Sequence, residues 1–143
     1  ATLKLENGSA TAASTSGGPA SGVSFEGWER FSRARMDEAV AAGKPVFVDF
    51  TAAWCITCLV NERVALDTPA SRRAFEQAGV VKLKGDWTNR DAEITAVLKE
   101  LGRAGVPLYL FWVPGASGPK ILPQVLTEGM ILSGLASLQQ ARR

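Results

Sequence analysis

The fold class of this chain is indicated by one run of residues, Phe47-Val48-Asp49-Phe50-Thr51-Ala52-Ala53-Trp54-Cys55-Ile56-Thr57-Cys58. It begins as an apolar run typical of a buried strand and ends in the only two cysteines of the sequence. If a helix starts at this point, the first sulfur lies at the helix N-terminus, whose partial positive charge favours the thiolate that attacks disulfides. We therefore expect Cys55 to be the attacking nucleophile and Cys58 the resolving thiol.

Composition limits the alternatives. A chain of 143 residues with 46% hydrophobic content can bury one core and is too short for two ordinary domains. A net charge of +2 without a basic cluster gives no sign of a nucleic-acid surface. The absence of histidine excludes Cys–His catalysis and His-based metal sites. No apolar run approaches the roughly 20 residues that span a bilayer.

The first part of the chain differs in composition from the rest. Residues 1–22 consist mostly of Ala, Ser, Thr and Gly, which predicts a flexible linker or an added tail. The remainder, residues 23–143, is expected to form the single domain. A linker before a domain that lacks an initiator methionine suggests a piece excised from a longer protein, and a trimmed tag would look the same.

Hydrophobic periodicity predicts alternating helices and strands along this domain. Helices are expected at Phe25–Ala42, from the cysteines to Leu66, at Ala70–Ala78 with Thr68 as N-cap, around Ile94–Leu101, and at Met130–Leu138. Strands are expected at Val46–Thr51, Val80–Lys84, Leu108–Val113 and, as a weaker edge pair, Ile121–Leu122 with Gln124–Leu126. This order predicts an α/β domain with a central mixed sheet and helices on both faces.

Several short motifs form a specific combination. Trp54 precedes the Cys-x-x-Cys, Gly105-Val106-Pro107 opens an apolar strand about fifty residues later, and Glu62 and Gly85-Asp86-Trp87-Thr88 lie between them. From Trp28 to Leu138 the sequence resembles the thioredoxin superfamily, and within it the C-terminal periplasmic domain of DsbD/ScsB-type thiol:disulfide interchange proteins. The resemblance implies a thioredoxin-like fold. Ile56-Thr57 and Leu59 differ from the residues common in thioredoxin.

The resemblance also implies that Pro107 is a cis-proline beside the active-site disulfide. A cis bond at the start of a central strand would leave the backbone of Val106 free to pair with an extended substrate segment. An ordinary trans proline is the general alternative. Trp54 is expected to form a wall of the substrate site, although a plain core or surface aromatic explains it nearly as well.

Two carboxylates flank the cysteines in sequence. By the resemblance, Asp49 matches the buried acid of thioredoxins, and Glu62 matches a glutamate of the DsbD C-terminal domain. A buried carboxylate with a raised pKa could exchange the proton of Cys58, while its charge would oppose thiolate formation at Cys55. Asp49 could instead be a structural acid, and Glu62 could lie on a solvated helix face. Lys82 could pair with Asp49, but an exposed strand lysine is favoured.

The leading functional hypothesis is a protein-disulfide reductase, a thiol:disulfide interchange domain. The resemblance implies that it relays electrons from a membrane-embedded donor domain to oxidised periplasmic thioredoxin-like proteins, as a monomeric domain tethered to the inner membrane. The Cys55–Cys58 disulfide would be the redox group, with no cofactor, metal or nucleic acid. One alternative is a copper-binding module that uses both thiolates. Another is a structural disulfide, although so short a loop stabilises little.

Overall fold

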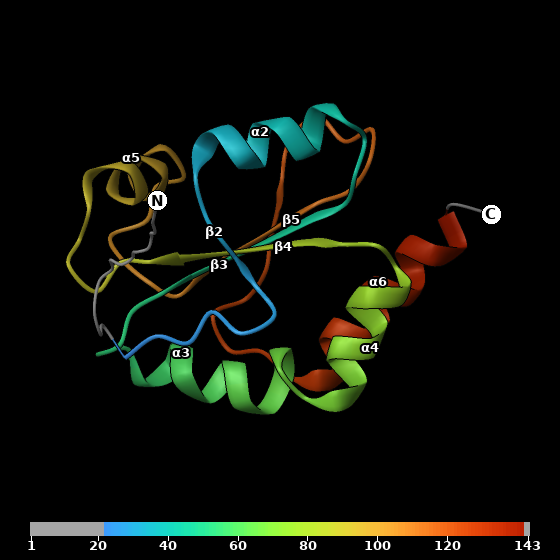
Figure 1. The fold of residues 1–143 in the computed structure, drawn as a ribbon, viewed down its shortest axis with the longest axis horizontal. Coiled ribbons are helices and arrows are strands. Elements are labelled where there is room, and N and C mark those ends of the chain that lie inside the picture. Colours follow the sequence, from blue (N-terminus) through green and yellow to red (C-terminus); the bar gives the residue numbers. More distant parts are fainter. Residues whose placement is uncertain (1–21, 142–143) are drawn as a thin grey trace, which may run out of the picture.

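The computed structural model describes residues 22–141, whose sheet has five strands in the order β2-β4-β3-β5-β6 (Figure 1). The strands are β2 (Glu29–Arg30), β3 (Val46–Thr51), β4 (Val81–Asp86), β5 (Leu108–Trp112) and β6 (Lys120–Ile121). The helices are α2 (Arg33–Ala41), α3 (Ile56–Asn61), the π-helical segment η1 (Glu62–Leu66), α4 (Pro69–Gln77), α5 (Ala92–Glu100) and α6 (Glu128–Ala141). The expected tail and linker at residues 1–22 lies, except for Gly22, outside the described residues.

The sheet is mixed and has β3 at its centre. β3 runs parallel to β4 and antiparallel to β5, and this register sets Asp49 opposite Lys84 on one side and Tyr109 on the other. All six residues of β3 are buried, as expected for a central strand covered on both faces. The register therefore brings three polar side chains together on one face of the buried sheet.

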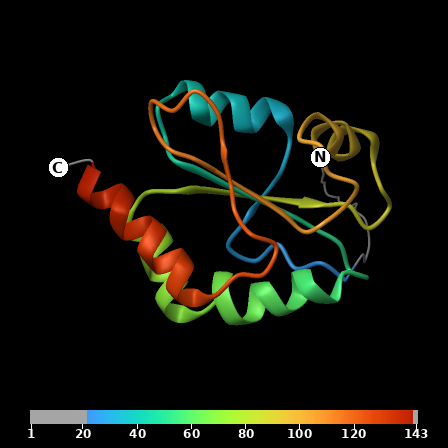
Figure 2. The same ribbon diagram turned by 180° about the vertical axis from the view of Figure 1, so that it is seen from behind.

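Helices cover both faces of the sheet, as predicted. Figures 1 and 2 show α2 and α5 on one face, and α3, α4 and α6 on the other. The core on the first face includes Val48, Phe50 and Leu110, whereas the core on the second includes Phe47, Phe75 and Phe111. Alternation along β3 explains this division, because successive side chains of a strand point to opposite faces.

Gly85 lies where two buried elements come very close together. A Cβ atom at this position would lie 2.7 Å from Cδ1 of Phe50 and 3.1 Å from Cδ1 of Ile94. Such contacts are too short, so a glycine is needed for β4 to pack beside the ring of Phe50. Thr88, three residues after Gly85, binds Ala53 and Trp54 just before Cys55, so this close packing also positions the site.

The helix predicted at Phe25–Ala42 is wrong in its first half. The helix begins at Arg33, where the hydroxyl of Ser32 accepts a hydrogen bond from the Arg35 amide as N-cap. The preceding Glu29–Arg30 instead pairs with β4 as the edge strand β2. The indole of Trp28 is buried against Phe47 and Phe75, so tertiary packing overrides the helical periodicity.

Two further expectations are corrected at the end of the chain. Gln124–Leu126 forms no strand. The side chain of Asn61 instead binds the carbonyl oxygen of Gln124 and the N–H of Leu126, the backbone groups that a neighbouring strand would bind. The closing helix is longer than expected and extends to Ala141. The broken helix after the cysteines is confirmed, with Thr68 capping the amide of Ser71 and Pro69 in the first turn of α4. Within residues 22–141, none of the helices is long and apolar enough to cross a membrane.

Candidate active site

Cys55 and Cys58 form a disulfide at the junction between β3 and α3, with their Cα atoms 5.3 Å apart. Cys55 is the N-cap of α3, and the backbone N–H of Cys58 donates to its Sγ over 3.2 Å. Cys55 is 7% exposed, whereas Cys58 is completely buried. An incoming sulfur therefore reaches Cys55 first, and an N–H group is already aimed at the sulfur that becomes the thiolate.

Trp54 stands beside the disulfide and is 45% exposed. Its indole Nε1 donates to the carbonyl oxygen of Thr88 over 3.1 Å, and the Thr88 hydroxyl accepts from the backbone N–H of Ala53 over 2.9 Å. Asp86 in turn accepts from the backbone N–H and the hydroxyl of Thr88. The segment after β4 thus holds the residues that immediately precede Cys55.

Aromatic and cationic side chains pack around Trp54. The rings of Trp54 and Trp87 have centroids 6.0 Å apart, and the guanidinium of Arg90 lies 4.8 Å from the Trp54 centroid. Arg90 adopts a φ of 51°, which turns the chain after Trp87. Trp54 therefore presents a half-exposed apolar surface next to the reactive sulfur, whereas its role in binding a substrate stays a prediction.

The segment before β5 approaches the cysteines from the other side. The Val106–Pro107 peptide bond is cis, as the resemblance implied. Pro107 is buried, and Val106 packs against the cluster formed by Ala52 and the two cysteines. The predicted Trp54, Val106 and Pro107 therefore all belong to segments next to the disulfide.

Asp49 is completely buried in β3. Neither of its carboxylate oxygens has a hydrogen-bond partner among the described residues. Burial raises the pKa of Asp49 well above its usual value, the negative charge of Glu62 raises it further, and the positive charge of Lys84 opposes both effects. Asp49 therefore holds its proton to a higher pH than an exposed aspartate does.

Glu62 does not lie on a solvated helix face, since only 13% of its side chain is exposed. Its Oε1 lies 3.7 Å from Nζ of Lys84, which also donates to the carbonyl oxygen of Ser24 over 2.7 Å. Burial raises the pKa of Glu62, while the positive charge of Lys84 counteracts the rise. Asp49, Glu62 and Lys84 thus form one electrostatically coupled group in which two acids share one buried cation.

Lys84, not Lys82, is the lysine opposite Asp49. Lys82 is half-buried, with its Nζ 4.8 Å from the centroid of the Trp28 ring, so the expected exposed lysine is not found either. Alternation along the predicted strand places both lysines on one face, but only the β3–β4 register decides which of them is opposite the acid.

Asn61 is a buried polar residue that sequence reasoning missed. Its Nδ2 donates to the hydroxyl of Tyr109 over 2.9 Å and to the carbonyl oxygen of Gln124 over 2.8 Å, and its Oδ1 accepts from the Leu126 N–H over 3.0 Å. Burial raises the pKa of Tyr109, which keeps its hydroxyl neutral. A polar residue in an apolar helical stretch is the one sequence signal that could have indicated this contact.

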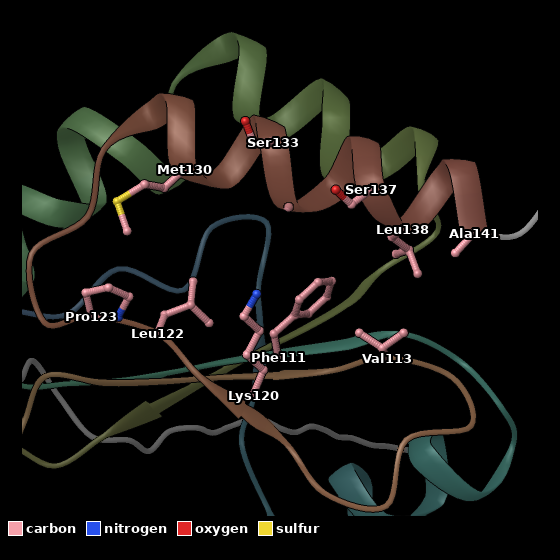
Figure 3. Close-up of a pocket in the computed structure, with 11 residues that line it drawn as sticks. Phe111, Val113, Lys120, Leu122, Pro123, Met130, Ser133, Ser137, Leu138 and Ala141 are labelled. Carbon is pink, nitrogen blue, oxygen red and sulfur yellow. The ribbon is translucent and has the colours of Figure 1, made fainter.

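A separate cavity of about 460 Å³ lies between α6 and the strands β5 and β6 (Figure 3). Phe111, Val113, Leu122, Met130 and Leu138 make its wall largely apolar. Among the described residues that line it, Lys120 alone is charged, and neither cysteine is one of them. The reactive groups therefore gather at the disulfide, away from this cavity.

Relatives at the sequence level support a redox role. A thioredoxin-like family model matches residues 27–114. The thiol:disulfide interchange protein DsbD of Ralstonia nicotianae is 35% identical over 126 residues, 85% of this chain and 20% of that protein. DsbD of Yersinia enterocolitica is 38% identical over 106 residues, 73% of this chain and 18% of that protein. The chain therefore spans about a fifth of the length of these relatives.

Solved structures support the same fold. The reduced C-terminal domain of Neisseria meningitidis DsbD aligns with a TM-score of 0.58 and 27% identity, over 73% of this chain and 91% of that domain. A thioredoxin from Thermus thermophilus aligns with a TM-score of 0.62 at 20% identity, over 79% and 88% of the two chains, and so supports the thioredoxin-like fold alone. The DsbD similarity and the Cys55–Cys58 disulfide support thiol–disulfide oxidoreductase chemistry. By a family match over more than half of its length, the chain belongs to the thioredoxin-like family.

Proposed function

We propose that this domain is a protein-disulfide reductase that relays electrons by dithiol–disulfide exchange through Cys55 and Cys58. The observation that supports it most is the asymmetry of the pair: Cys55 is the more exposed sulfur and accepts the Cys58 N–H, whereas Cys58 is buried behind it. This is the arrangement that an attacking and a resolving thiol require. The redox group is the cysteine pair itself, with no further cofactor.

In the proposed reaction the reduced domain starts with a Cys55 thiolate and a Cys58 thiol. The thiolate attacks a substrate disulfide, one substrate sulfur leaves as a thiolate, and a mixed disulfide with Cys55 remains. Cys58 then loses its proton and attacks Cys55, which releases the second substrate thiolate and leaves the Cys55–Cys58 disulfide. The substrate gains two electrons and the domain loses two.

Asp49 and Glu62 are the proposed proton acceptors for Cys58. Burial raises the pKa of each carboxyl group above its usual value, which makes each carboxylate a stronger base than an exposed one. Lys84 limits this rise in both acids. The same negative charges oppose ionisation of Cys55, whose thiolate is favoured by the N–H of Cys58.

Trp54, Val106 and Pro107 are the proposed substrate contacts, because all three belong to segments beside the disulfide.

The similarity to DsbD motivates the proposed electron donor, acceptors and location of this domain. The electron donor would be a membrane-embedded domain, the acceptors would be periplasmic thioredoxin-like proteins, and this domain would lie in the periplasm next to the inner membrane. The copper alternative would rely on the two cysteine sulfurs alone, because the described residues contain no group of three or more Cys, His, Asp or Glu that could hold a metal ion.

The decisive experiment equilibrates the chain with glutathione buffers and measures the reduction potential of the Cys55–Cys58 couple. A potential near the roughly −270 mV of thioredoxin would support a reductant, whereas one near about −120 mV would reverse the direction of electron flow. A Cys58→Ala variant, which cannot resolve the mixed disulfide, should trap substrates on Cys55. A couple that neither equilibrates nor traps a thiol would refute the redox function.

A further inference from the structure

The helical segment that follows the cysteines exposes several large apolar residues on its outer face, unlike an ordinary surface helix. Ile56, Val60 and Val64 are 71%, 50% and 46% exposed. In contrast, the polar Asn61 is buried and Glu62 is largely so. A surface helix normally presents charged and polar residues to water and apolar residues to the core.

The polar residues on the inner side of this helix bind other parts of the domain, whereas the apolar residues on its outer side face solvent. Asn61 binds the 122–127 segment, and Glu62 approaches Lys84. Ile56, Val60 and Val64 follow one another at intervals of four residues, so they form one stripe along the helix surface. Figures 1 and 2 show α3 along the edge of the molecule, with no described element beyond its outer side.

The stripe is continuous with the place where the reaction occurs. Ile56 directly follows Cys55, and at a rise of about 1.5 Å per residue Val60 lies about 7.5 Å along α3 from that cysteine, with Val64 about one turn further on in η1. Any protein that forms a mixed disulfide with Cys55 must bring its surface to this point. An ordinary interface buries about 800 Å² per partner, a disc of about 16 Å radius, so it would cover the stripe.

We propose that Ile56, Val60 and Val64 form a docking surface, here called the valine stripe, for a folded redox partner whose reactive cysteine lies beside an apolar patch. Arg63, which is exposed on the same helix, favours an acidic side chain on the partner. A lipid surface is disfavoured, because membrane-binding helices carry several basic residues and Arg63 is the only cation between Ile56 and Leu66. The inference rests on the proposed thiol–disulfide exchange and adds the surface that selects the partner.

The test compares protein and small-molecule disulfides on the same thiol. In a Cys58→Ala background, the reduced chain is mixed either with glutathione disulfide or with an oxidised periplasmic extract of Escherichia coli. Mixed disulfides are followed on non-reducing gels, and trapped proteins are identified by mass spectrometry. The test variant adds Val60→Gln and Val64→Gln, which remove apolar surface without adding charge and favour the helix more than valine does. The matched control adds Ile121→Gln, since Ile121 is an exposed apolar residue on the edge strand β6.

We expect the protein-to-glutathione rate ratio to fall about tenfold in the stripe variant, as for the loss of one good interface anchor, and to stay unchanged in the control. A ratio within twofold of the parent would overturn the docking surface, as would a parent that traps glutathione but no protein. Binding to phosphatidylglycerol vesicles is measured in parallel. If the stripe variant loses this binding while its protein-to-glutathione rate ratio stays intact, the stripe would be assigned to a membrane instead. A parent that reacts with neither disulfide would refute the proposed function itself, which is a distinguishable result.

Discussion

Replacing Lys84 by methionine removes the one cation that two buried acids share. Nζ of Lys84 lies 3.7 Å from Oε1 of Glu62, and the lysine side chain is only 1% exposed. At about 4 Å and an effective dielectric constant of about 20, two unit charges attract each other by about 4 kcal/mol. Methionine keeps most of the apolar length of the side chain, so the change removes the charge and the hydrogen bond to the carbonyl oxygen of Ser24.

The expected loss of stability for Lys84→Met is about 3 kcal/mol at pH 8. Removing one partner of a buried pair typically costs about 3–5 kcal/mol, and the partly exposed Glu62 favours the lower end. The pKa values of Asp49 and Glu62 are raised on folding, so stability falls as pH rises through them. Without Lys84 both pKa values rise further, so the loss grows with pH and is smallest near pH 5.

Urea unfolding at pH 5 and pH 8 measures this difference for the wild type, Lys84→Met and the double variant Lys84→Met/Glu62→Gln. The double variant should recover part of the loss at pH 8, because the uncompensated Glu62 charge is gone. Lys120→Met, at an exposed lysine, is the matched control and should stay within about 0.5 kcal/mol of the wild type. A loss that is equal at both pH values and is not relieved by Glu62→Gln would refute the shared-cation reasoning.

Three further changes test separate features of the fold and the site. Asn61→Ala should cost about 2–4 kcal/mol in urea unfolding, because buried groups that include the Leu126 N–H lose their partner, and a loss below 1 kcal/mol would contradict this. Gly85→Ala should cost about 1–3 kcal/mol, since its Cβ would lie 2.7 Å from the ring of Phe50, and an unchanged melting temperature would argue against that contact. Asp49→Asn should gain stability relative to the wild type as pH rises, by up to about 1.4 kcal/mol per pH unit while the buried acid ionises, and parallel stability profiles would show that Asp49 has no raised pKa.

Expectations based on local sequence were the most accurate. The strand Val46–Thr51 and the helix break before Pro69 follow from patterns that a few adjacent residues determine. The expectation at Phe25–Ala42 was wrong because Trp28 has a helical spacing but packs against residues distant in sequence. Periodicity shows that a residue is buried but not which neighbour buries it.

The candidate site divides in the same way. The strand followed by Cys55 and Cys58 indicated the disulfide and its place at a helix start, because the spacing of the motif and the start of the helix are local. The pairing of Asp49 with Lys84 depends on how β3 and β4 align, and a shift of one residue would turn each of their side chains to the other face.

Patterns in the amino-acid sequence were thus enough to predict the α/β class, the cysteine pair and most helices and strands. They could not show that two acids share Lys84, that Asn61 replaces a strand pairing, or that the valine stripe has no described element over it. Propensity and periodicity act over only a few neighbouring residues. Register, burial of charge and exposure depend on contacts between segments that lie 60 or more residues apart in this chain.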